Sequence, residues 1–158
     1  MVEIRTMRPG DWPAVAAIFV EGIATRGATF ETEAPSYASF DAAHHSEHRF
    51  VAIEDDRVVG WVALAPTSAR TCYAGVTESS VYVAESARGR GVGRALMEEL
   101  VASAQAAGFW TIHAGMFPEN AASVGLHESL RFRLVGRFER IAQLDGVWRD
   151  TVLLELRL

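Results

Sequence analysis

Cysteine is nearly absent from this sequence, in which Cys72 is the only one. A single cysteine excludes an internal disulfide and a zinc site built from several cysteines. No apolar run reaches the roughly 18 residues that a membrane-spanning helix needs. The first residues, MVEIRTMRPGDW, lack the apolar core of a signal peptide. Together these absences predict a cytoplasmic protein with no membrane partner.

Basic residues are fewer than acidic residues in this sequence. Arginine and lysine together number 15 against 20 aspartates and glutamates, which gives a net charge of −5 and a pI of about 5.5. An acidic protein of this kind does not surround nucleic acid with a general positive field, so no nucleic-acid partner is expected. A local basic patch can still bind a small anionic ligand.

The sequence has enough apolar residues for a core of its own. Its 158 residues are the length of one ordinary domain, and 49% of them are apolar. A chain of this size buries most of the surface that it exposes when unfolded. No linker, repeat or low-complexity segment divides it. We therefore expect a single domain over residues 1–158.

Apolar periodicity predicts strands and helices in the order β α α β β β α β α β β. Strands are expected at residues 1–7, on both sides of a turn at Asp55-Asp56 within 50–64, at 71–83, at 110–117, and in a hairpin over 132–158 that turns at Asp145-Gly146. Helices are expected after the N-cap candidates Asp11 and Ser36, between a glycine-rich turn and Gly108, and over 118–130.

This order of elements predicts the fold class. Strands that follow one another in hairpins favour antiparallel pairing, and a single β-α-β crossover adds one parallel pair. The parallel pair should join the strand that ends at Val83 to the strand that starts near Trp110. The expected fold is α+β, with a mixed and mostly antiparallel sheet flanked by helices.

The glycine-rich turn ESARGRGVGRAL, residues 85–96, follows a strand and precedes a helix. It is not a P-loop, because its glycines are not followed by a lysine and then a serine or threonine. It is not the dinucleotide pattern G-x-G-x-x-G either, because Arg94 and Leu96 stand where the third glycine would be.

What remains in this turn is a combination that suits a pyrophosphate. Glycines let backbone N–H groups approach an anion, and the helix that follows adds its positive N-terminal end. Arginines supply fixed charge and forked donors. The residues concerned are Arg88, Gly89, Arg90, Gly91, Val92, Gly93 and Arg94. The alternative is a surface loop with solvated arginines, but its place between a strand and a helix favours an anion site.

The spacing Arg88-x-x-Gly91-x-Gly93 resembles the acetyl-CoA signature [R/Q]-x-x-G-x-[G/A] of the GNAT superfamily of N-acetyltransferases. Within that superfamily, nearly the whole chain resembles the phosphinothricin acetyltransferase group. The segments that carry this resemblance are TESSVYV at 77–83, Pro118-Glu-Asn120, Leu126-His127-Glu128 and Trp148-Arg-Asp150. The resemblance implies the GNAT fold, acetyl-CoA as cosubstrate and no metal.

The resemblance also implies how the cosubstrate is held. Two parallel strands would separate, and the pantetheine arm of acetyl-CoA would lie between them. Backbone groups of Val81, Tyr82 and Val83 would pair with this arm, and the Val83 amide would donate to the thioester oxygen. Asn120 and Ser123 would contact the pantetheine or the acceptor. The alternatives are core packing for the strand residues and simple helix capping for Asn120.

Acetyl transfer requires a neutral amine, and a carboxylate can take the proton of the ammonium form. The phosphinothricin group has a glutamate at the position of Glu78, which is therefore the candidate base; the alternative is an exposed glutamate at a strand end. His127 stands where many GNAT enzymes have the tyrosine that protonates the thiolate, and its alternative is packing. His113 is expected to be a satisfied core residue. His44, His45 and His48 resemble a metal cluster only in number, since no acidic or cysteine partner has suitable spacing.

The acceptor amine should bind near Phe30, Arg70 and Tyr73, which match the group's substrate positions. An arginine there can pair with a carboxylate of the acceptor, and the alternative is a surface charge. Two positions depart from the group. Ala74-Gly75 stands where its best-known members have Asp-Trp, which implies a wider or differently shaped pocket, and Arg131 replaces the glycine that usually follows the helix over 118–130.

The sequence therefore predicts an acetyl-CoA-dependent N-acetyltransferase. By resemblance, the acceptor is a small amino-acid-like amine of the phosphinothricin, methionine sulfone or methionine sulfoximine type, which attacks directly in a ternary complex. Acetylation of a peptide or protein N-terminus and an acetyl-CoA-binding module without turnover are the alternatives. Members of this group usually form dimers, so a homodimer is expected, with the C-terminal strands as interface.

Overall fold

The computed structural model describes residues 1–158. The strands are β1 (Glu3–Thr6), β2 (Arg49–Glu54), β3 (Arg57–Pro66), β4 (Val76–Val83), β5 (Thr111–Met116), β6 (Arg133–Leu144) and β7 (Val147–Arg157). The helices are α1 (Trp12–Ala24), α2 (Tyr37–Ala43), α3 (Val92–Ala106) and α4 (Ala121–Ser129), with short 3-10 turns at Pro9–Asp11, Thr71–Tyr73 and Glu85–Ala87. No helix is long and apolar enough to cross a membrane.

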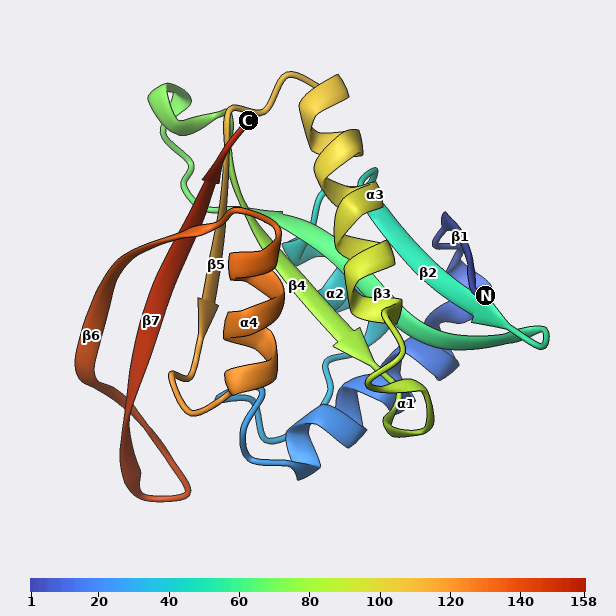
Figure 1. Cartoon of the computed structure of the whole chain (residues 1–158), viewed down its shortest axis with the longest axis horizontal. Coiled ribbons are helices and arrows are strands. Elements are labelled where there is room, and N and C mark those ends of the chain that lie inside the picture. The colour runs from blue at the N-terminus through green and yellow to red at the C-terminus, as the bar shows by residue number, and fades with distance from the viewer.

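The strands form one sheet in the order β1-β2-β3-β4-β5-β7-β6. Every neighbouring pair is antiparallel except β4 and β5, which are parallel. Helices α3 and α4 lie on one face of the sheet, and α1 and α2 lie on the other (Figure 1). This arrangement confirms both the α+β class and the parallel pair that the sequence predicts.

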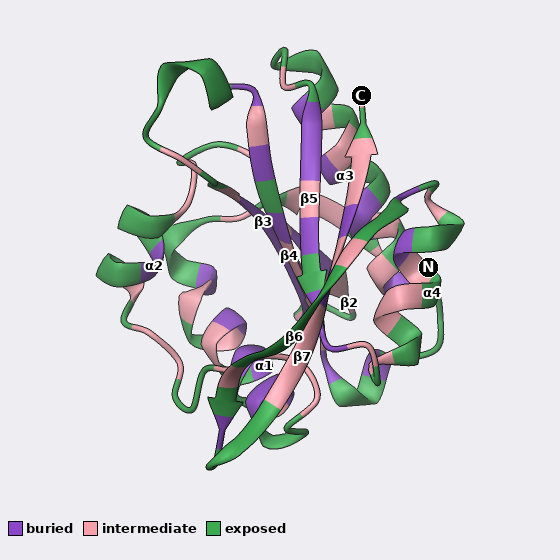
Figure 2. Cartoon of the chain, turned by 90° about the vertical axis from the view of Figure 1, so that its left-hand side faces the viewer, coloured by how far each residue is buried: buried purple, intermediate pink, exposed green.

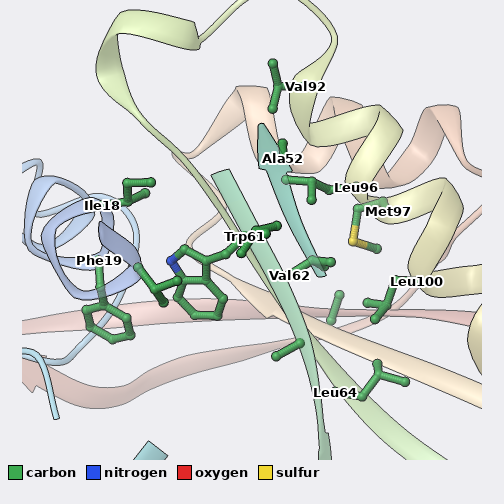
Figure 3. Close-up of a cluster of buried hydrophobic side chains, with 14 of the residues drawn as sticks. Ile18, Phe19, Ala52, Trp61, Val62, Leu64, Val92, Leu96, Met97 and Leu100 are labelled. Atoms are coloured by element: carbon green, nitrogen blue, oxygen red, sulfur yellow. The ribbon is translucent and has the colours of Figure 1, made fainter. Parts of the chain in front are cut away.

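The core has two layers, one on each face of β3. Along a strand, successive side chains point to opposite faces. Trp61 therefore packs against Phe19 of α1, with ring centroids 5.9 Å apart. Val62 and Leu64 point the other way, towards Leu96 and Leu100 of α3 (Figure 3). Strand β3 is thus buried on both faces, and it forms the rigid support against which β4 is paired.

Strand β4 begins later than predicted. The sequence places a strand from Thr71, but residues 71–73 form a 3-10 turn and β4 starts at Val76. The reason is local hydrogen bonding: the Tyr73 amide donates to Arg70 and the Ala74 amide donates to Thr71. These bonds between residues three apart are incompatible with an extended strand.

Two helix-end predictions have different outcomes. Ser36 caps α2 as predicted, because its hydroxyl accepts a hydrogen bond from the Ser39 amide at 3.2 Å. The Asp11 side chain does not cap α1. Its carboxylate is bound instead by both terminal nitrogens of Arg5, each at 2.8 Å. The Arg5 guanidinium thereby holds the pKa of Asp11 below its usual value, although burial opposes this shift.

Arg131 adopts the left-handed backbone conformation, with φ of 70°. A residue with a side chain pays roughly 1–2 kcal/mol for this conformation, whereas glycine adopts it freely. This is the position at which the resemblance described above led us to expect glycine, and the left-handed conformation found here is one that favours glycine.

The β6–β7 hairpin extends beyond the rest of the sheet, and β6 is an edge strand (Figures 1 and 2). Its surface carries large apolar side chains that no other part of the chain covers. These exposed residues are Leu134, Val135, Phe138, Ile141, Val147 and Trp148.

Candidate active site

Strands β4 and β5 pair over only three residue pairs, from Val76–Thr111 to Glu78–His113. Beyond Glu78, β4 continues to Val83 without a partner on that side, and the two strands diverge (Figure 1). Helix α4 and the start of α3 flank the opening. The sheet therefore contains a wedge-shaped gap with its vertex at Glu78 and His113.

The backbone of β4 turns alternate residues towards this gap. The Ala84 amide donates to Val59, at 2.8 Å, in continuation of the β3–β4 ladder. In an antiparallel ladder every second residue bonds to the same neighbour. Tyr82 therefore bonds to β3, whereas the backbones of Val81 and Val83 face the gap. Of the three residues predicted to pair with pantetheine, only these two have N–H and C=O groups directed to the right side.

The Tyr82 side chain belongs to the core. Its ring packs in a cluster with the rings of Phe19 and Trp61, with centroids 4.9 Å from each, and those two rings are 5.9 Å from one another. Burial raises the pKa of its phenol, and a hydrogen bond with Thr29 opposes that shift. The ring also lies against Gly22 of α1, where a Cβ atom would be only 2.7 Å from Tyr82 Cε1. Tyr82 thus fixes the position of β4 instead of offering groups to a ligand.

The glycine-rich turn joins β4 to α3 and lies beside the wide end of the gap (Figure 1). Gly89 and Gly91 have φ of 75° and 83°, a conformation that glycine adopts without strain, and no atom lies within 4 Å of where their Cβ atoms would be. Helix α3 has no side-chain cap at its N-cap, Gly91. Its first N–H groups are therefore available to an anion.

The three arginines of this turn all have partners within the protein. Arg88 Nε donates to the Val83 carbonyl at 3.1 Å. Arg90 forms a two-pronged ion pair with Glu54, at 2.7 and 2.8 Å. Arg94 bonds to Glu98 and to the Ser129 hydroxyl. An anion in this turn would meet the glycine N–H groups directly, and the guanidinium groups after a change of partner.

Asn120 joins α4 to the loop between α1 and α2. Its Oδ1 accepts from the Ser123 amide at 3.2 Å, and its Nδ2 donates to the Gly27 carbonyl at 3.1 Å. The predicted capping role is therefore present, and the second bond anchors the loop. The backbone amide of Ser123 takes part in this cap, and its carbonyl accepts from His127.

Glu78 occupies the vertex of the gap. It is exposed, it pairs with Ala65 on β3 and with His113 on β5, and its carboxylate has no partner in the protein. It points to the α1–α2 face of the sheet, the same face as Tyr82. A proton-accepting group thus stands beside the gap with nothing bound to it.

His127 is only 3% exposed. Its Nδ1 lies 2.7 Å from the Ser123 carbonyl, and its ring meets Phe132 edge to face. Burial lowers the pKa of His127, although the hydrogen bond to Ser123 opposes this. Because the carbonyl can only accept, Nδ1 carries the proton and Nε2 is left as an acceptor. A neutral imidazole held in this way cannot donate a proton from Nε2, so the geometry favours packing over thiolate protonation.

The predicted acceptor residues fall into two groups. Phe30 packs edge to face on Phe117, in the loop near the C-terminal end of β4. Arg70 lies 5.5 Å above the Tyr73 ring, in the turn before β4 begins. The eight residues of β4 separate these ends, which at about 3.3 Å per residue is roughly 25 Å. The two groups therefore lie towards opposite ends of β4, with Glu78 between these ends.

The end of β4 at which Arg70 lies also carries a pocket. An open pocket there is lined by Thr67, Ser68, Tyr73, Val76, Thr111, His113 and Glu155. The space beside Gly75 does not enlarge it. A Cβ atom at Gly75 would come within 2.0 Å of the Trp110 ring, so this indole already fills the volume that the missing side chain leaves. Of the two expectations, a wider or a differently shaped pocket, this contact favours the second.

The remaining histidines have separate partners. His44 Nδ1 contacts the Phe40 carbonyl, and His48 Nδ1 contacts the Ser103 hydroxyl, each at 2.7 Å. His45 packs against Phe109. No group of three or more histidine, cysteine or acidic side chains is arranged to hold a metal ion. His113 is not a core residue as predicted, since its side chain is 29% exposed and lies 3.6 Å from Glu155.

Two residues that sequence reasoning missed hold the loop over the wide end of the gap. The Arg149 guanidinium lies 3.9 Å from the Phe117 ring centroid and donates to the Arg26 carbonyl at 3.0 Å. Arg149 belongs to the segment Trp148-Arg-Asp150, which is one of those that carry the family resemblance, so the sequence did mark this region. Phe117 had none, because an aromatic residue at a strand end is ordinary core material.

Comparison with known proteins agrees with this geometry. The family model described as Acetyltransferase (GNAT) family matches residues 12–132. An L-methionine sulfoximine/L-methionine sulfone acetyltransferase of Pseudomonas paraeruginosa is 29% identical, over 98% of this chain and 94% of the relative. A phosphinothricin N-acetyltransferase of Alcaligenes faecalis is 30% identical, over 96% of this chain and 80% of the relative.

Among solved structures, a GNAT superfamily phosphinothricin acetyltransferase from Sinorhizobium meliloti, in complex with acetyl-CoA, superposes with a TM-score of 0.90. It is 28% identical, over 99% of this chain and 88% of that chain. The gap between two parallel strands, the uncapped glycine turn and these matches lead to one conclusion: the chain belongs to the GNAT family and is an N-acetyltransferase.

Proposed function

We propose that this protein transfers the acetyl group of acetyl-CoA to the amine of a small amino-acid-like compound, of the methionine sulfoximine, methionine sulfone or phosphinothricin type. The observation that carries the proposal is the gap at the end of the β4–β5 pairing, into which free backbone groups of β4 point. The acceptor class rests on the names of the two relatives.

The residues around the gap fit the cosubstrate. The open space over Gly89 and Gly91 and the uncapped start of α3, with Val92 and Gly93, suit the pyrophosphate. A pantetheine arm has two amides, which need partners when they leave water. The backbone groups of Val81 and the Val83 amide offer such partners along the gap, whereas the Val83 carbonyl already accepts from Arg88; Ser123 lies across the gap on α4.

The acceptor would bind on the α1–α2 face, in the pocket that Tyr73 lines, with Arg70 close enough to meet a carboxylate. Glu78 takes one proton from the ammonium group. The nitrogen lone pair then attacks the thioester carbon, the carbon–sulfur bond breaks, and the thiolate takes the second proton that the nitrogen loses. This route is a direct attack in a ternary complex, and it requires no proton from His127.

The donor to the thioester oxygen must lie close to the attacking amine. At about 3.3 Å per residue, Val83 is roughly 16 Å along β4 from Glu78, whereas Val81 is roughly 10 Å away. A glutamate side chain and one bridging water span the shorter distance. We therefore assign the oxyanion contact to the Val81 amide and leave Val83 to the pantetheine.

The exposed apolar side chains of the β6–β7 hairpin support a second part of the proposal, a homodimer. An edge strand presents unpaired N–H and C=O groups, and Leu134, Val135 and Phe138 make this one apolar as well. A second copy of the chain offers the same edge, so two copies can cover each other symmetrically.

The test is release of free CoA thiol from acetyl-CoA with methionine sulfoximine, methionine sulfone, phosphinothricin, common amino acids, polyamines and short peptides as acceptors. Release with the first three and not with peptides supports the proposal. Release with peptides alone would support N-terminal acetylation. Tight acetyl-CoA binding with no release from any amine would leave a binding module and refute the transferase function for these acceptors.

Glu78→Gln tests the base assignment. Removal of a general base lowers turnover by roughly 10²-fold or more, while the binding of acetyl-CoA should stay the same because the gap is unchanged. Glu128→Gln is the matched control, since Glu128 is an exposed glutamate of α4 whose side chain makes no hydrogen bond or ion pair. Full turnover in Glu78→Gln would remove Glu78 from the mechanism.

A further inference from the structure

A row of ionisable side chains crosses the sheet beside Glu78. Glu78 of β4 is the register partner of His113 on β5, His113 pairs with Glu155 on β7, and Glu155 pairs with Arg133 on β6. Directly opposite residues lie on the same face of a sheet, and neighbouring strands are about 4.8 Å apart. The four side chains therefore stand next to one another on the face where the acceptor pocket lies.

The contacts within this row orient the imidazole. His113 Nε2 is 3.6 Å from Glu155 Oε2, and the other oxygen of Glu155 is 2.5 Å from Arg133. Glu155 is thus held by Arg133 and faces the imidazole, as a carboxylate does in an acid–base pair that orients a histidine. Glu78 is the register partner of His113 on the other side of the row, and its carboxylate makes no hydrogen bond or ion pair within the protein.

The position of the row is as informative as its composition. Glu78–His113 is the last pair before β4 and β5 separate. His113 and Glu155 line the pocket together with Tyr73, and Arg157 pairs with Thr111, which lies two residues before His113 on β5. These are the ionisable groups that face the imidazole. His113 is therefore the imidazole nearest to Glu78 along the row, and the route from Glu78 through it leads to partly exposed side chains.

We propose that His113 receives the proton that Glu78 removes from the acceptor amine, and that Glu155 orients it for this task. This inference rests on the proposed transferase function. One proton moves from the ammonium nitrogen to the Glu78 carboxylate, and then from Glu78 to the imidazole, which returns it to water after the products leave. Glu78 is thereby a carboxylate again and ready for the next cycle. His113 acts through Glu78 and is a positioning and relay residue.

The experiment compares His113→Gln with the unaltered enzyme between about pH 5.5 and 8.5. Histidine changes its charge in this range, and only the neutral ring can accept a proton. We expect little difference at the acid end and a loss of roughly tenfold in kcat at the alkaline end, with an unchanged KM for acetyl-CoA. Free imidazole in the buffer should restore part of the loss. A ratio of rates that does not vary with pH would indicate a structural role and overturn the relay.

His48→Gln is the matched control, because His48 is bonded to Ser103 on α3, away from the gap. A second measurement needs no turnover. In Glu78→Gln at fixed pH, the NMR signal of His113 Cε1 should shift and that of His48 should not. An unshifted signal overturns the inference even if the enzyme is active. A shifted signal in a protein that acetylates no amine would refute the proposed function, and the relay with it.

Discussion

Replacement of Gly22 by alanine tests the contact that holds β4 in place. A Cβ atom there would lie 2.7 Å from Tyr82 Cε1 and 2.8 Å from Cδ1, whereas non-bonded carbon atoms prefer about 3.5–4.0 Å. The ring would have to move by roughly 1 Å. It cannot move freely, because it is packed in a three-ring cluster with Phe19 and Trp61, whose centroids each lie 4.9 Å from its own.

Two effects of opposite sign decide the stability of Gly22→Ala. Overpacking of a filled core costs typically 1–3 kcal/mol, and alanine in a helix gains at most about 1 kcal/mol over glycine. We therefore expect a net loss of about 1–2 kcal/mol in the free energy of unfolding. The displaced ring also moves the segment from Val81 to Val83, so the KM for acetyl-CoA should rise.

Gly125→Ala is the matched control. Gly125 lies within α4, and no atom lies within 4 Å of the position that its Cβ would take, so this variant keeps the helical gain without the clash. Urea denaturation followed by circular dichroism should separate the two variants by about 2 kcal/mol. Equal stabilisation of both would refute the packing of Tyr82 against α1, and with it our account of how β4 is fixed.

Three further predictions concern the glycine turn, α4 and the edge strand. Glu54→Gln frees Arg90 from its ion pair and should strengthen acetyl-CoA binding by about two- to fivefold at low salt, with a smaller gain at high salt. Calorimetric titration measures this affinity, and weaker binding by the variant would contradict the prediction. His127→Asn should change turnover by less than about threefold, because a lost general acid would cost far more. Burial lowers the pKa of His127 in the folded protein below that of a histidine in the unfolded chain. Below about pH 6.5 the unfolded chain therefore binds more protons at this residue than the folded protein does, and the wild type loses stability as the pH falls. The stability difference between wild type and His127→Asn should therefore shrink from pH 8 to pH 5 in urea titrations, and a constant difference would exclude a buried neutral ring. Phe138→Glu should yield monomers in sedimentation velocity, whereas Val20→Glu, at an exposed apolar position of α1, should not; monomeric wild-type protein would refute the dimer.

Local sequence patterns were sufficient for most of the fold. The alternation of apolar residues predicts β3 and β5, the glycines at 89 and 91 predict the turn with positive φ, and the single crossover predicts the parallel pair. The start of β4 was misplaced because the turn at residues 71–73 depends on weak local hydrogen bonds, for which Thr71 and Tyr73 give no strong signal.

The candidate site was only partly accessible in this way. Residues that lie in one short segment, such as Arg88 to Arg94, carry their spacing in the sequence itself. The role of Tyr82 depends on which neighbour its backbone bonds, and that choice is made by the register with β3. Phe30 and Tyr73 lie towards opposite ends of β4, a separation that nothing in the sequence measures.

The sequence by itself determined the donor side of this enzyme: a glycine turn between a strand and a helix is a local structure, and its conformation follows from residues that are neighbours along the chain. Tertiary structure alone decided the acceptor side. His113 stands beside Glu78 and Glu155, and Trp110 fills the space at Gly75. These partners are at least 35 residues apart in the chain, and a register shift of one residue would turn each side chain to the opposite face.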